Sequence, residues 1–228
     1  HAAAAGPART LAGCVFPVGL MMIVFVGGEL FTGDCMMSMA WMQRKIHFAD
    51  MLRTLVLVYV SNFVGAALIA FLVAHSGQYD YSSGALGAYT IKVAYGKVHL
   101  SFANALVSGI LCNILVCVAV LMAAAAKDIA GKVLAIFFPI LAFVVSGFEH
   151  CVANMYYIPA GIFASKNAAY AAKAFELYNI DSTQLSSLNW GSFAISNLIP
   201  VTIGNIIGGA LLVGGACFYL HGKALHES

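Results

Sequence analysis

Long runs without a single charged residue constrain the fold of this chain more than any other feature. These runs cover residues 10–28, 54–74, 100–126, 133–148 and 193–220. A helix of about 20 apolar residues spans the hydrocarbon core of a bilayer. Charged residues make up only 9% of the chain, against about 25% in soluble domains. The sequence therefore predicts an all-α integral membrane protein, with one transmembrane domain over residues 1–228.

Two of the apolar segments are interrupted at membrane depth. The first breaks at VGGELFTG (residues 26–33) and the fourth at SGFEH (residues 146–150), so that each break places Gly shortly before Glu. Ionisable residues are costly inside a membrane and usually mark a functional site. We expect broken helices over residues 10–43 and 133–165, and continuous helices over 54–74, 100–126 and 193–220.

Paired broken helices in corresponding positions indicate an inverted repeat with a site near the midplane of the membrane. A repeat of three plus three helices needs six spans, and the sequence supplies five. We therefore expect a first transmembrane helix to be missing from this chain. The start at His1 without Met fits that expectation, and residues 1–9 would then be the end of the missing segment.

The composition excludes several other classes. All six cysteines lie in apolar runs without CxxC spacing, so we interpret them as small apolar residues rather than disulfides or metal ligands. The net charge of +2 and the lack of a basic run give no reason to expect a nucleic-acid partner. We expect no metal, no cofactor and no enzyme activity.

The distribution of basic residues gives a weak indication of orientation. One group clusters at helix ends: Arg44, Lys45, Arg53, Lys127, Lys132 and Lys223. By the positive-inside rule this group lies in the cytoplasm, which makes the C-terminus cytoplasmic. The opposite side then carries Arg9, Lys92, Lys97, Lys166 and Lys173, together with the connectors at about 76–99 and 166–190.

His150 is the strongest candidate for chemistry, because a neutral imidazole exchanges a proton near neutral pH. The alternative is a core histidine that only bonds a neighbour. Glu149 has the same place at the second break that Glu29 has at the first. A residue repeated at both breaks is expected to hold backbone groups that lack water in hydrocarbon, whereas His150 has no such counterpart.

Three further features suggest a pore. Leu30 and Phe31 place bulky apolar side chains before Thr32 at the first break, which indicates either a hydrophobic gate or ordinary packing. Phe143 lies seven residues before His150, about two helical turns away, and forms a second candidate constriction. Lys97 precedes a span and is either a snorkelling lysine or an attractor for anions at a pore mouth.

The segments GFEHCVANM (147–155), NLIPVTIGN (197–205) and ELFTG (29–33) resemble the signatures of the formate/nitrite transporter family. SNFVGA (61–66) and CNILVC (112–117) are similar to its third and fourth helices. The resemblance covers nearly the whole chain. It implies an aquaporin-like protomer with six helices, one pore per protomer, and a homopentamer in the lipid bilayer of the cell membrane.

The resemblance also implies roles for particular residues. His150 is then the central pore histidine, with Thr32 and Asn154 hydrogen-bonded to it or to the permeant. Lys97 matches the lysine of the outer vestibule. Leu30 and Phe31 resemble the cytoplasmic constriction, and Leu20 and Phe143 the periplasmic one. One departure is Asp34, where a neutral polar residue is expected; we expect it to cap the following half-helix.

The family moves small monovalent anions, and we expect formate first, with nitrite or hydrosulfide as alternatives. Lys97 would attract the anion, and desolvation would favour its neutral acid. The acid would receive its proton directly or from His150, and the proton would either travel with it or return to His150. A neutral-solute channel of the aquaporin type is a rival, although the Asn-Pro-Ala pairs are absent. A metal or haem enzyme using Glu149 and His150 is a weaker one.

Overall fold

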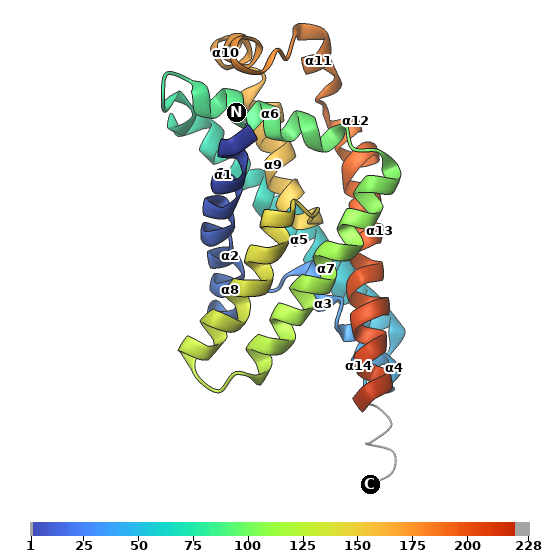
Figure 1. Ribbon diagram of the computed structural model, residues 1–228. Coiled ribbons are helices and arrows are strands. Elements are labelled where there is room, and N and C mark those ends of the chain that lie inside the picture. Colours follow the sequence, from blue (N-terminus) through green and yellow to red (C-terminus); the bar gives the residue numbers. More distant parts are fainter. Residues whose placement is uncertain (1, 222–228) are drawn as a thin grey trace.

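The computed structural model describes residues 2–221, and the regular secondary structure over that range is all helical. His1 and Lys223, which the sequence analysis named, lie outside the described residues. Most helices run along one long axis, while α6, α10 and α11 lie at one end and α4 and α14 at the other (Figure 1). We call these the α10 end and the α4 end.

The first half of the chain forms α1 (Ala2–Val15), α2 (Pro17–Val26), α3 (Phe31–Asp34), α4 (Met37–Met42), α5 (Phe48–His75), η1 (Gln78–Asp80) and α6 (Ala85–Val98). The second half forms α7 (Phe102–Ala125), α8 (Ile129–Ser146), α9 (Cys151–Ala164), α10 (Ala168–Tyr178) and α11 (Ser182–Ser187). The last span combines α12 (Trp190–Ser192), η2 (Phe193–Leu198), α13 (Ile199–Ile206), η3 (Ile207–Val213) and α14 (Gly214–His221). Both η2 and η3 are π-helical.

Five helical segments among the described residues are long and apolar enough to cross a membrane: Gly6–Val26, Phe48–His75, Phe102–Ala125, Ile129–Ser146 and Trp190–Leu220. Cys151–Ala164 is a shorter apolar helix. Large apolar side chains on these segments are widely exposed, as expected where lipid replaces water as the solvent. The all-α membrane class predicted from the sequence is confirmed, and the chain is a multi-pass membrane protein.

The two breaks have the same backbone design. Helix α2 ends at Gly27 and helix α8 at Gly147, with φ of 79° and 74°, in the left-handed region that favours glycine. In each case the next half-helix begins after an extended residue, Leu30 before α3 and His150 before α9. Glu29 and Glu149 therefore occupy equivalent places, two residues after the left-handed glycine.

The two connectors at about 76–99 and 166–190 are largely helical. Helix α10 is fixed against the α6 region by two contacts. The Tyr170 hydroxyl donates to Asp80 Oδ1 at 2.6 Å, and Lys92 Nζ lies 4.7 Å from the centroid of the Tyr178 ring. The hydrogen bond to Asp80 raises the pKa of the Tyr170 hydroxyl. These contacts close the α10 end over the bundle.

Small residues bring α7 and α13 into close backbone contact. A Cβ atom at Gly204 would collide with the carbonyl oxygen of Leu106, and one at Gly208 with that of Ile110. Close approach through glycine is a common way to pack membrane helices. This packing buries one face of α13, with Val201 and Asn205, next to the second break.

We predict that Gly204→Ala lowers the stability of the protein by about 2 kcal/mol, because its methyl group would push α13 away from the α7 backbone. Thermal unfolding in detergent, followed by intrinsic fluorescence, measures the effect. Gly96→Ala is the control, since a Cβ there meets nothing within 4 Å. An unfolding midpoint for Gly204→Ala equal to that of the wild type would contradict the prediction.

Candidate functional site

The two helix breaks meet through one hydrogen bond. Thr32 Oγ1, at the start of α3, lies 2.8 Å from His150 Nε2, at the start of α9. Thr32 is fully buried and His150 is 7% exposed. Two residues 118 positions apart in the chain are thus brought together at the point where both helices are interrupted.

The hydrogen bond at the second ring nitrogen of His150 fixes the tautomer of the neutral imidazole, that is, which nitrogen carries the proton. His150 Nδ1 accepts a hydrogen bond from the Ala153 N–H at 3.0 Å, so the ring is the N-cap of α9. A nitrogen that accepts carries no proton, and a neutral imidazole then has its proton on Nε2. His150 therefore donates to the Thr32 hydroxyl, whose own proton stays available for another acceptor.

Apolar side chains surround this pair on the α2 and α8 side. The Phe143 ring lies nearly parallel to the His150 ring, with centroids 6.0 Å apart. Phe143 also belongs to a buried cluster with Leu20, against which Leu30 packs. Phe16 contacts the Phe143 ring edge-on at 5.4 Å. Sequence reasoning did not select Phe16, and its position between two apolar helices gave no distinguishing signal.

Phe31 lies on a different side of the break from Leu30. It is buried in a second cluster with Val58 and Val201, and its ring meets that of Tyr59 edge-on at 4.8 Å. The neighbouring residues Leu30 and Phe31, expected to form one constriction, therefore pack against two different groups of helices.

Lys97 reaches from α6 to the second break and forms an ion pair there. Its Nζ atom lies 2.8 Å from Glu149 Oε1, and the two side chains are 18% and 8% exposed. Asn154 Nδ2 donates to Glu149 Oε2 at 2.6 Å and to Asn197 Oδ1 at 2.7 Å. Asn154 Oδ1 is buried without a hydrogen-bond partner among the described residues.

The roles expected for Glu29 and Glu149 at the breaks are filled by asparagines instead. Asn62 on α5 accepts from the Phe31 N–H at 3.0 Å and donates to the Glu29 carbonyl at 3.2 Å. Glu29 is exposed. The Glu149 carboxylate contacts the side chains of Lys97 and Asn154 rather than the backbone N–H groups we expected.

Asn205 on α13 makes the equivalent pair of bonds at the second break. It accepts from the Cys151 N–H at 2.9 Å and donates to the Glu149 carbonyl at 3.1 Å and to the Gly109 carbonyl at 2.8 Å. A signal was present in the sequence, since both asparagines begin an Asn-X-X-Gly pattern in an apolar span, at 62–65 and 205–208.

Asp34 also differs from the expectation. Helix α4, which follows it, has no side-chain cap at its first residue. Asp34 Oδ2 is buried and has no hydrogen-bond partner among the described residues. The expected cap is therefore not formed.

Comparison with known proteins identifies close relatives of this architecture. A family described as "Formate/nitrite transporter" matches residues 1–219. The "Formate channel FocA" of Haemophilus influenzae is 40% identical over 210 residues, which cover 92% of this chain and 73% of the relative. A "Probable formate transporter" of Methanothermobacter thermautotrophicus is 41% identical over 229 residues, covering 94% and 75%.

Solved structures of the same family also resemble this chain. A structure described as "Pentameric formate channel with formate bound" has a TM-score of 0.82 and 32% identity, covering 98% of this chain and 85% of the other. An "FNT family ion channel" has a TM-score of 0.76 and 28% identity, covering 93% and 77%.

We predict that Asn205→Ala destabilises the protein by roughly 3 kcal/mol and Asn62→Ala by roughly 2 kcal/mol, since each hydrogen bond lost contributes about 1 kcal/mol. Thermal unfolding in detergent measures both. Asn104→Ala, at an exposed position of α7, is the control. The prediction fails if Asn205→Ala unfolds at the same temperature as Asn104→Ala.

Proposed function

Because the chain belongs to the formate/nitrite transporter family, we propose that it conducts formate across the membrane through a pore between its two helix breaks. The observation that carries this proposal is the hydrogen bond between Thr32 and His150, at 2.8 Å. The titratable group lies beside the ring of Phe143, which shares a buried apolar cluster with Leu20. Formate is also the substrate named for the relatives.

Lys97 is the attractor for the anion in this proposal. An ammonium group has three N–H donors, and the contact with Glu149 engages one of them. The remaining donors are available to a carboxylate. Glu149 holds the ammonium group close to the second break, so an anion bound there lies near the apolar entrance to the Thr32–His150 pair.

Desolvation then favours the protonated permeant. An anion leaving water for an apolar constriction loses hydration energy that a neutral acid does not lose to the same extent. Formate is therefore expected to pass Phe143 as formic acid. Asn154 Oδ1, a buried acceptor without a partner among the described residues, is suited to accept the hydrogen of an acid hydroxyl.

The geometry of His150 favours a proton relay over a proton reservoir. Its Nε2 proton can reach the permeant through Thr32 only if Nδ1 gains a proton, because the alternative product is an imidazolate. Protonation of Nδ1 removes the cap on the Ala153 N–H, and loss of an N-cap costs about 1 kcal/mol. The imidazolium is therefore short-lived: a proton taken up at Nδ1 from the water on the entry side is matched by the Nε2 proton passed through Thr32 to formate, so one proton crosses with each formate.

The matching bonds of Asn62 and Asn205 support an aquaporin-like inverted repeat as part of the proposal. The three-plus-three repeat, and with it the additional first helix expected from the sequence, stays a prediction. A homopentamer is proposed because a structural relative is described as pentameric. We also propose that Leu20, Leu30, Phe31 and Phe143 form the constrictions and that the α4 end faces the cytoplasm, with the chain in the cell membrane.

We predict that His150→Asn lowers proton-coupled formate uptake roughly a hundredfold, since proton transfer by a positioned side chain contributes about that much or more. Asparagine is itself a good N-cap, so the fold is retained while the titratable group is lost. Formate uptake into liposomes that contain a pH indicator measures the formate flux and the proton flux together. His99→Asn, at an exposed histidine of the α10 end, is the control, and undiminished uptake by His150→Asn would overturn the relay.

Among small solutes, we expect formate to cross faster than nitrite, hydrosulfide or lactate at about pH 6 and at about pH 8, on either side of the range in which histidine titrates. The same liposomes measured with each anion test this order. Faster nitrite or hydrosulfide flux would assign the protein to another substrate of the family. Rapid water flux without any anion flux would instead indicate a neutral-solute channel.

A further inference from the structure

Tyr59 on α5 links the first break to the last membrane span. Its ring meets the ring of Phe31 with centroids 4.8 Å apart and planes at 72°. Its hydroxyl lies 2.9 Å from Thr202 Oγ1 on α13. Asn62, one helical turn further along α5, bonds the Phe31 N–H. Helix α5 therefore holds Phe31 through both its ring and its backbone.

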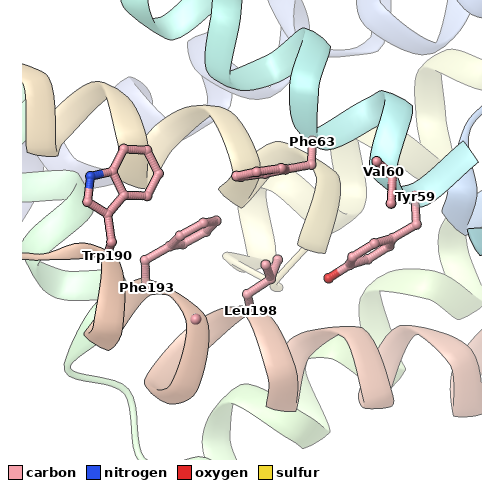
Figure 2. Close-up of a pocket in the computed structure, with 7 residues that line it drawn as sticks. Tyr59, Val60, Phe63, Trp190, Phe193 and Leu198 are labelled. Atoms are coloured by element: carbon pink, nitrogen blue, oxygen red, sulfur yellow. The ribbon is translucent and has the colours of Figure 1, made fainter.

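Two cavities that open onto the membrane-facing surface lie beside this contact. A cavity of about 360 Å³ is lined by Phe31 and Tyr59 together with apolar residues of α5 and α13, among them Val56 and Ile203. A second cavity of about 260 Å³ lies on the other side of Tyr59, which lines both. Figure 2 shows this second cavity, where the Tyr59 ring reaches from α5 toward the helix that carries Phe193 and Leu198.

Where the Phe31 ring lines the open cavity, its position depends on the side chains packed around it, Tyr59 among them. The described aromatic contact of Phe31 is with Tyr59, and Tyr59 is itself tied to Thr202. Loss of the Tyr59 ring would join the two cavities and leave Phe31 free to move into the enlarged space. Phe31 directly precedes Thr32, which bonds His150, so this movement would change the width of the passage at the breaks.

We propose that Tyr59 is a positioning residue that backs the Phe31 ring and thereby sets the largest carboxylic acid the pore passes. The inference rests on the proposed function, in which Phe31 forms part of the constriction. It assigns selectivity by size to a residue on the membrane-facing helix α5, behind the pore wall, which touches the permeant only through Phe31.

The test compares propionate with formate uptake by the full-length protein in liposomes. Tyr59→Leu should raise the propionate-to-formate uptake ratio about fivefold, the factor that corresponds to the free energy of one aromatic pair contact. Tyr59→Phe keeps the ring and should stay within about twofold of the wild type, since the ring contact and not the hydroxyl supplies the aromatic pair. Val56→Phe fills the cavity beside Phe31 from an exposed position and should lower the ratio.

Leu57→Phe is the matched control for Val56→Phe, because Leu57 is exposed on the same helix and lines neither cavity. A wild-type protein that does not take up formate would overturn the proposed function itself. Wild-type uptake combined with an unchanged ratio in Tyr59→Leu would overturn only the inference, as would a proportional fall in both fluxes. If Tyr59→Leu does not fold, an unchanged ratio in Val56→Phe overturns the inference instead.

Discussion

Two interrupted helices inside an apolar bundle leave backbone groups that no water can satisfy, and the rest of the structure depends on how these groups are paired. Each break receives one asparagine from a neighbouring membrane span, Asn62 from Phe48–His75 and Asn205 from Trp190–Leu220. Asn62 and Asn205 accept from the first N–H of the following half-helix and donate to the carbonyl of the preceding glutamate. The breaks are thereby held open in a fixed geometry.

This arrangement frees the other polar residues near the breaks for different tasks. At the second break, the carboxylate of Glu149 is not used on the backbone and instead holds Lys97. His150 caps α9 with one nitrogen and bonds Thr32 with the other. The chemistry proposed for the pore is therefore possible because Asn205, a neutral residue on α13, pairs the backbone groups of the second break. Glu149 and His150 are then free to make other contacts.

The sequence allowed much of this to be predicted, for a physical reason. Charge is so costly in hydrocarbon that Glu29, Glu149 and His150 marked both breaks within otherwise uncharged runs. What could not be predicted was the pairing across the bundle. Asn205 lies 56 residues from its partner Glu149, and nothing local shows which way Phe31 turns. Its contact with Tyr59 depends on how α5 and α13 pack, which is set by many distant residues together.

The ion pair between Lys97 and Glu149 has a consequence for the setting in which the protein works. Dissolved salt screens exposed charges over about 8–10 Å at physiological ionic strength, but reaches sheltered pairs much less. With side-chain exposures of 18% and 8%, these two charges are largely sheltered from mobile ions. The attraction between Lys97 and an anion close to it should therefore persist in brackish or saline surroundings. Exposed charges on the surface of the α10 end are screened by salt under the same conditions.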